Sequence, residues 1–155
     1  MSLTLINDAK LSKYIISTIN YNYNYKERGL DLFPGPQPVS IEKKDLIKLK
    51  QHNYNVGLKL DGTRYLLCFI KDKMDNNLCI LINRALELYS ININTKNDSI
   101  FNNVTIIDGE LCNNNFIIND GVTVEGVRIN KMNHDIRLSI IEKCLKENII
   151  NTEIV

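Results

Sequence analysis

Clusters of asparagine and aspartate divide the middle of this chain into short apolar segments. The clusters Asp75-Asn76-Asn77 and Asn113-Asn114-Asn115 are typical of tight turns, because these side chains tolerate left-handed backbone and bond to their own turn. The apolar segments have the length of strands and cover residues 64–70, 78–83, 104–111 and 116–124. Tight turns between successive strands favour antiparallel pairing. The pattern therefore predicts a mostly antiparallel sheet.

Apolar residues at helical spacing predict three helices around this sheet. Residues 7–19 carry one apolar face, with Asn7 or Asp8 as the N-cap. Ser40 can cap a second helix that reaches about Gln51, and Asn133 can cap a third that reaches about residue 145. At 155 residues and 44% hydrophobic content, the chain has the size and composition of one globular domain. We therefore expect a single α+β domain with flanking helices.

Charge and cysteine content exclude several classes of protein. The formal net charge is +1, so no global basic field drives binding to nucleic acid. The four cysteines are isolated from one another and from both histidines, which argues against a zinc site. Neither a secretory signal nor an apolar stretch of the ~20 residues that a membrane helix needs is present. We therefore expect a cytoplasmic or nuclear protein that is not secreted and has no membrane partner.

Residues 59–64 place a lysine, an aspartate, a glycine and an arginine around one predicted turn. The amine of Lys59 can act as a covalent nucleophile once its pKa is lowered by burial or by neighbouring cations. Gly62 lets backbone approach a ligand closely, and Arg64 can return toward the same place. The same segment also fits a plain surface hairpin, with strands at residues 54–59 and 64–70 and solvated charges.

Three further charged residues lie in or beside the predicted strands. Arg84 follows Lys59 by 25 residues, and Glu110, within Asp108-Gly109-Glu110-Leu111, follows it by 51. Asp120 is the last residue of the segment FIIND, residues 116–120. Plainer readings remain open: Arg84 as a surface arginine, Glu110 as a carboxylate paired with a lysine, and Asp120 as part of a turn.

Together these segments resemble the covalent nucleotidyltransferases, the family of DNA ligases, RNA ligases and mRNA capping guanylyltransferases. That family carries K-x-D-G-x-R, then an arginine, then D-G-E, then an aromatic-plus-aspartate strand. Residues 33–40, FPGPQPVS, also resemble the FPG-x-x-PV segment of the capping guanylyltransferases, which DNA ligases lack. The chain thus resembles the N-terminal part of the nucleotidyltransferase domain of a capping guanylyltransferase.

The resemblance implies a site, a reaction and its ligands. It makes Lys59 catalytic and assigns nucleotide binding to Asp61, Gly62, Arg64, Arg84, Glu110 and Asp120. The lysine amine would attack the α-phosphate of GTP and displace pyrophosphate, and the GMP would then pass to the 5′-diphosphate end of RNA. Because a free lysine has a pKa near ~10.4, neighbouring cations or a bound metal must lower that of Lys59. The implied cofactor is Mg²⁺ or Mn²⁺, and no residue is singled out as its ligand.

The chain also departs from the family pattern. Asn119 stands where the family has an aromatic residue, and no D-G-L-I-like motif, K-x-K motif or OB-fold lid follows Val124. We therefore expect residues 1–155 to be a single, incomplete nucleotidyltransferase domain. Two alternatives stay open. The chain can be a non-catalytic or half-domain module that needs a partner polypeptide, or a fragment of an ATP-dependent polynucleotide ligase.

Outside these motifs, tyrosines alternate at positions 21, 23 and 25. They can stack RNA bases, but an edge strand or exposed surface is the simpler interpretation. His52 and His134 have no partners nearby in the sequence, and we expect both to be structural.

Overall fold

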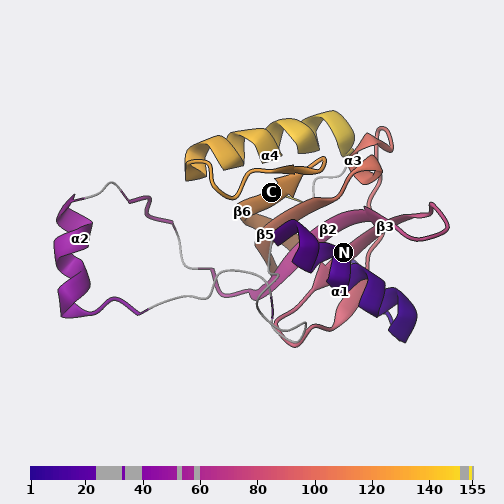
Figure 1. Cartoon of the computed structure of the whole chain (residues 1–155), viewed down its shortest axis with the longest axis horizontal. Helices are drawn as coiled ribbons and strands as arrows, with labels where there is room; N and C mark the ends of the chain where they lie inside the picture. Colours follow the sequence, from indigo (N-terminus) through magenta and orange to yellow (C-terminus); the bar gives the residue numbers. More distant parts are fainter. Residues whose placement is uncertain (24–32, 34–39, 52–53, 58–59, 151–153, 155) are drawn as a thin grey trace.

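The computed structural model describes the chain except residues 24–32, 34–39, 52–53, 58–59, 151–153 and 155, and it contains one antiparallel sheet (Figure 1). The seven strands of the described part are β1 (Thr4–Leu5), β2 (Thr63–Lys71), β3 (Asn77–Ile82), β4 (Leu88–Ser90), β5 (Thr105–Cys112), β6 (Asn115–Val124) and β7 (Val127–Arg128). Their order across the sheet is β1-β4-β3-β2-β5-β6-β7. The helices are α1 (Ala9–Tyr23), the 3-10 turn η1 (Lys43–Asp45), α2 (Leu46–Gln51), α3 (Ser99–Asn102) and α4 (His134–Asn148). The predicted α+β class is confirmed.

The central strand β2 is buried on both faces. Its alternate residues Leu67 and Phe69 pack in one cluster with residues of α3 and α4, among them Ile141. The intervening residues, such as Leu66, pack in a second cluster with Ile15 of α1. Figure 1 shows α1 and α4 on different sides of the sheet ribbon. Because both faces are covered, the strand reads as a continuous apolar run.

The predicted asparagine-rich turns are confirmed. Asp75 has a φ of 67° between β2 and β3, and Asn113 and Asn114 have φ values of 49° and 67° between β5 and β6. These residue types adopt left-handed backbone more readily than most. The turn after β2 is further held by Asp72, whose Oδ1 accepts the backbone N–H groups of residues 74 and 76 at 2.7 and 2.9 Å.

The first predicted helix is longer than the sequence pattern indicated. Asp8 caps it, with Oδ1 accepting the N–H groups of residues 10 and 11 at 2.8 and 3.1 Å. The helix continues to Tyr23, so a strand at residues 21–23 is wrong, and Tyr25 lies outside the described residues. The side chain of Asn22 donates to the Thr18 carbonyl one turn earlier, at 2.9 Å. This hydrogen bond is a contact within the helix.

The predicted hairpin at Asp61-Gly62 is wrong for the described residues. Residues 54–57 and 60–62 are not in a strand, and β2 begins only at Thr63. The reason is that β3 and β5 already occupy the two edges of β2, so the preceding segment has no edge to pair with. Likewise, Asn119-Asp120-Gly121 is no turn, because it lies inside β6 at an irregularity of the β5–β6 register.

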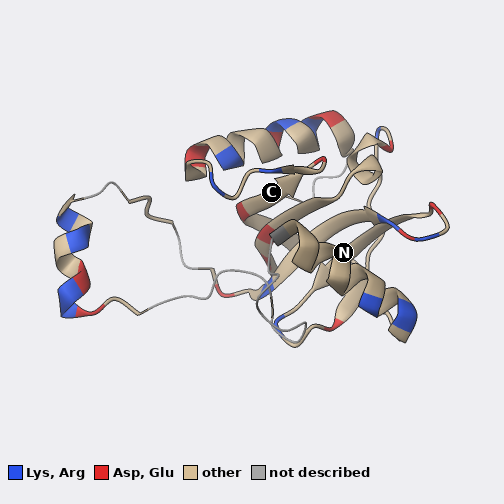
Figure 2. Cartoon of the chain, viewed as in Figure 1, with Lys and Arg blue, Asp and Glu red and all other residues tan. Residues whose placement is uncertain are grey.

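The second predicted helix is shorter than expected and starts later. It begins as η1 at Lys43, and Asp45 Oδ2 accepts the N–H of Glu42 at 3.1 Å, so Ser40 is not its cap. In Figure 1 this region stands away from the sheet, and Figure 2 shows blue Lys and Arg ribbon along its helix. The short strands β1, β4 and β7 and the helix α3 were not expected from the sequence. Among the described residues, no helix has the length and apolar character that a membrane crossing requires.

Candidate functional site

A cleft of about 550 Å³ lies where β2 begins, β3 ends and β5 ends. Its lining residues are Leu60, Asp61, Gly62, Thr63, Arg64, Asn83, Arg84, Ala85 and Glu110. Five of the predicted nucleotide-binding residues are therefore brought together from segments up to about fifty positions apart. Lys59 lies outside the described residues, one position before the first lining residue.

Strand pairing places the two sides of the cleft next to each other. Arg64 of β2 lies opposite Glu110 of β5 in the antiparallel register. Gly62, just before β2, packs against the end of β5. A Cβ at this position would meet the carbonyl oxygen of Leu111 at 2.9 Å and the sulfur of Cys112 still closer. Only glycine fits there without a shift of the backbone, which explains the glycine of the motif.

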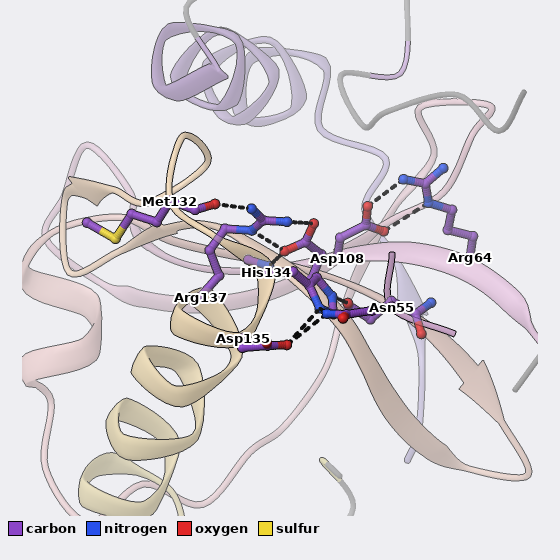
Figure 3. A network of polar contacts seen from close by, with 10 residues as sticks. Asn55, Arg64, Asp108, Met132, His134, Asp135 and Arg137 are labelled. Atoms are coloured by element: carbon purple, nitrogen blue, oxygen red, sulfur yellow. Dashed lines mark hydrogen bonds and ion pairs between the residues drawn. The ribbon is translucent and has the colours of Figure 1, made fainter. Parts of the chain in front are cut away.

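Arg64 is held by a buried ion pair with Asp108. Its Nε donates to Asp108 Oδ1 at 2.9 Å, and its Nη2 donates to Oδ2 (Figure 3). The two side chains are only 16% and 5% exposed. The guanidinium carbon also lies 5.3 Å from the ring centre of Phe33. Such a two-point pair fixes the direction of an arginine, so the Asp108 carboxylate and the Phe33 ring set where the Arg64 side chain lies beside the cleft.

Arg84 is presented by a turn that the Asn83 side chain holds closed. Asn83 Oδ1 accepts the N–H groups of Ala85 and Glu87 at 2.9 and 3.0 Å, and its amide donates to Glu87 Oε2 at 2.6 Å. The Tyr89 hydroxyl donates to the same carboxylate at 3.0 Å. These two hydrogen bonds, from Asn83 first and Tyr89 second, lower the pKa of Glu87. Arg84 itself is exposed and lines the cleft.

Glu110 contributes the least satisfied polar atom of the cleft. Its Oε2 is buried and has no hydrogen-bond partner in the part of the chain that the structure describes. Buried polar atoms are normally paired, and leaving one unpaired costs free energy. A ligand group that donates a hydrogen bond, or a cation, would satisfy this oxygen.

Asp120 does not line the cleft but lies beside it. It is opposite Asp108 in the register of β5 and β6. The guanidinium of Arg137 in α4 binds it at two points, with Nε–Oδ1 at 2.6 Å and Nη2–Oδ2 at 2.8 Å. This pairing raises the pKa of Arg137. Two neighbouring carboxylates, Asp108 and Asp120, therefore each hold one arginine.

A second cavity, of about 710 Å³, lies on the N-terminal side of the Lys59 segment. It is lined by Tyr54, Asn55, Val56, Gly57, Asn119, Asn133, His134 and Asp135. The Asn55 amide donates to Asp135 Oδ1 at 2.8 Å and lies 3.1 Å from Nδ1 of His134. His134 therefore has a hydrogen-bond partner that is distant in the sequence.

Comparison with known proteins decides the family. Residues 5–153 match the model of the mRNA capping enzyme catalytic domain, which is almost the whole chain. The chain belongs to the mRNA capping enzyme family. The predicted resemblance to the capping guanylyltransferases is thereby confirmed.

Curated capping enzymes give the same result over shorter regions. The chain is 40% identical over 85 residues to the mRNA-capping enzyme subunit alpha of Neurospora crassa, which is 51% of this chain and 21% of that protein. It is 37% identical over 89 residues to the subunit alpha of Schizosaccharomyces pombe, which is 52% of this chain and 22% of that protein. It is 51% identical over 35 residues to the mRNA-capping enzyme of Danio rerio, which is 23% of this chain and 6% of that protein. The chain spans about a fifth of the two subunits.

Sequence reasoning missed the residues that position the site. In the sequence, Asp108 stood out only as the first residue of D-G-E. An aspartate inside a buried apolar strand does give a signal, because a buried carboxylate requires a cationic or hydrogen-bonding partner. Arg137 gave no signal, because its partner Asp120 is 17 residues away. Asn83 did give a signal, since an asparagine at a strand end often forms hydrogen bonds within the following turn.

Proposed function

We propose that this chain forms the GTP-binding part of an mRNA guanylyltransferase, which transfers GMP to the 5′-diphosphate end of RNA through an adduct on Lys59. The observation that carries the proposal is the cleft in which Asp61, Arg64, Arg84 and Glu110 meet beside the Lys59 segment. Membership of the capping enzyme family supports the class of reaction.

The cleft offers a nucleotide both cationic donors and carboxylate acceptors. Arg64 and Arg84 supply cationic donors for ribose or phosphate oxygens, and arginine suits planar two-point binding of such groups. Glu110 offers a buried acceptor to a ribose hydroxyl. Gly62 keeps the backbone close to β5, and Asp61 orients the loop. Asp120 acts from outside the cleft, beside the Asp108–Arg64 pair.

The proposed reaction has two balanced steps. The neutral amine of Lys59 attacks the α-phosphorus of GTP and forms a phosphorus–nitrogen bond. The bond between the α-phosphorus and the oxygen that bridges to the β-phosphate breaks, pyrophosphate leaves, and the nitrogen loses one proton. The terminal phosphate oxygen of the RNA then attacks the same phosphorus, the phosphorus–nitrogen bond breaks, and the lysine nitrogen regains a proton. Because phosphoryl transfer depends on positioning and charge stabilisation, the arginines of the cleft favour both steps.

The cleft also offers two carboxylates to a divalent cation. Asp61 and Glu110 both line it, whereas no three acidic, histidine or cysteine side chains of the described residues are placed to hold a metal by themselves. Enzymes that use nucleotides commonly hold Mg²⁺ through one or two carboxylates together with the substrate phosphates. These donors therefore fit Mg²⁺ or Mn²⁺ that arrives with GTP. Such an ion, when bound, neutralises charge on the phosphates.

Labelling with radioactive GTP tests the proposal. The chain is incubated with [α-³²P]GTP and Mg²⁺ or Mn²⁺ and run on a denaturing gel. We expect label on the wild type, no label on Lys59→Ala, and full label on Lys143→Ala, an exposed lysine of α4 outside the cleft. Label that persists in Lys59→Ala contradicts the proposed role of Lys59. A parallel reaction with [α-³²P]ATP separates capping from ligase chemistry, which requires ATP.

A second candidate is a module that depends on a partner polypeptide. Two of the relatives are named as subunits, and the chain spans about a fifth of them. We infer that residues 1–155 are one nucleotidyltransferase domain that further polypeptide completes. Under this candidate, GTP labels Lys59 only after a polypeptide that supplies the missing family motifs is added, and the isolated chain stays unlabelled.

A further inference from the structure

We propose that Asn55, His134 and Asp135 form a clamp that positions the segment carrying Lys59. The proposal rests on the function proposed above and adds three positioning residues that the family motifs do not include. None of them lines the nucleotide cleft, and all three line the second cavity. Figure 3 shows their side chains converging from two parts of the chain.

The hydrogen bonds of the clamp define its chemistry. The Asn55 amide is a donor toward both Asp135 Oδ1, at 2.8 Å, and His134 Nδ1, at 3.1 Å. With Nδ1 as the acceptor of the Asn55 amide, Nε2 is the donor nitrogen of the ring. That nitrogen faces the carbonyl oxygen of Asn119 at 3.0 Å, as a donor should. Every partner in the chain of contacts therefore has the matching donor or acceptor role.

The clamp is anchored to α4 and to strand β6 of the sheet. His134 and Asp135 form the first turn of α4, which packs on β6. Asn119 belongs to β6, and the next residue, Asp120, is tied to α4 by the two-point pair with Arg137. The clamp thus joins residues 54–57 to the part of β6 and α4 that the Asp120–Arg137 ion pair also connects.

Asn55 is close in sequence to the proposed nucleophile, Lys59. Lys59 follows Asn55 by four residues and precedes Gly62 by three. Gly62 is the second anchor, because its close packing against β5 fixes the other end of the segment. Four residues extend at most ~14 Å, so fixing both ends restricts the region that the lysine amine can reach.

The structure supplies few other anchors for this end of the segment. Val56 is 98% exposed and Tyr54 is 54% exposed, so burial contributes little there. For residues 54–57, the side-chain hydrogen bonds that the structure describes are those of Asn55. Loss of the clamp should therefore leave the fold intact while it loosens the Lys59 segment. Misplacement of a reacting group by about 1 Å can slow a reaction on the order of 100-fold.

Reversal of the donor and acceptor tests the clamp. Asn55→Asp places a carboxylate beside the Asp135 carboxylate and removes the donor. The double variant Asn55→Asp/Asp135→Asn restores one amide–carboxylate bond in the opposite direction. We measure the single-turnover rate of [α-³²P]GMP transfer to the chain, the GTP concentration at half-maximal rate, and hydrogen exchange of residues 54–64.

We expect Asn55→Asp to slow transfer at least about 10-fold, to leave the half-maximal GTP concentration within about 2-fold, and to speed exchange in residues 54–64. The double variant should recover most of the rate. Asn92→Asp, at an exposed asparagine outside both cavities, should behave as wild type. An unchanged rate in Asn55→Asp, or a slow rate that the double variant does not recover, overturns the clamp alone. A wild type that takes no label overturns the proposed function, and the positioning role with it.

Discussion

The sheet and the region before it show that apolar sequence does not by itself decide burial. Residues 65–70 of β2 are all buried, because the strand has a partner on each edge and a helix layer on each face. We call residues 40–51 and 54–57 the arm. It also contains isoleucine, leucine and valine, yet Ile41 and Ile47 are 68% and 62% exposed. A six-residue helix such as α2 is too short to be stable on its own in water.

The stability of the molecule therefore resides mainly in the sheet. The long-range pairing of β2 with β3 and β5 fixes the three strand ends that line the cleft. Asn55 of the arm is hydrogen-bonded to His134 and Asp135 in the first turn of α4. We therefore expect mutations in the sheet to alter folding, and mutations in the arm to alter function with little effect on folding.

The largest effect should come from a matched pair of isoleucines. Ile80 in β3 is fully buried, so Ile80→Ala should lower the free energy of unfolding by about 2–5 kcal/mol. Ile47→Ala in the arm should change it by no more than about 0.5 kcal/mol. Urea unfolding followed by circular dichroism measures both. Equal losses would show that the side chain of Ile47 is packed as tightly as that of Ile80.

A matched pair of aspartates gives the next largest effect. Asp108→Ala leaves the guanidinium of Arg64 buried without its partner and should cost about 3–5 kcal/mol. Asp75→Asn removes the exposed charge partner of Lys71, keeps a residue type that tolerates the left-handed backbone of this turn, and should cost at most about 1 kcal/mol. The same unfolding experiment applies. A loss below about 1 kcal/mol for Asp108→Ala would mean that the pair contributes orientation without stability.

The smallest effect concerns the turn that presents Arg84. Asn83 and Tyr89 lower the pKa of Glu87 in the folded chain. The charged carboxylate therefore stabilises the turn at pH values above the ~4.3 of an unperturbed glutamate, and this stabilisation is lost as the pH falls through the lowered pKa. NMR titration of the Ala85 and Glu87 amides should give a midpoint below ~4.3 in the wild type. Tyr89→Phe should move that midpoint upward, and a midpoint that does not move contradicts the assignment.

The strands of the sheet were predictable because their signals are local. Asn113 and Asn114 mark a tight turn by their own chemistry, and the apolar runs on either side have the length of strands. The register of the sheet, the short strands β1, β4 and β7, and the failure of the hairpin at Asp61-Gly62 were not predictable. They depend on which strand edges are already occupied, which is a property of the whole sheet.

The site divides in the same way. Arg64, Arg84 and Glu110 were predictable because they follow a family motif at fixed spacing, and the cleft brings them together. Their supports, such as Asp108 for Arg64, act through contacts that only the folded sheet creates. Asn55 carried no motif signal, because its partners in α4 are about 80 residues away.

The most direct test of the account is to locate the nucleotide on the protein. The chain is incubated with GTP and Mg²⁺ or Mn²⁺, digested, and analysed by mass spectrometry. We predict one GMP group, attached to the side-chain nitrogen of Lys59, and no AMP on Lys59 when ATP replaces GTP. GMP on another residue, or a Lys59 peptide that remains unmodified while the chain turns over GTP, would contradict it.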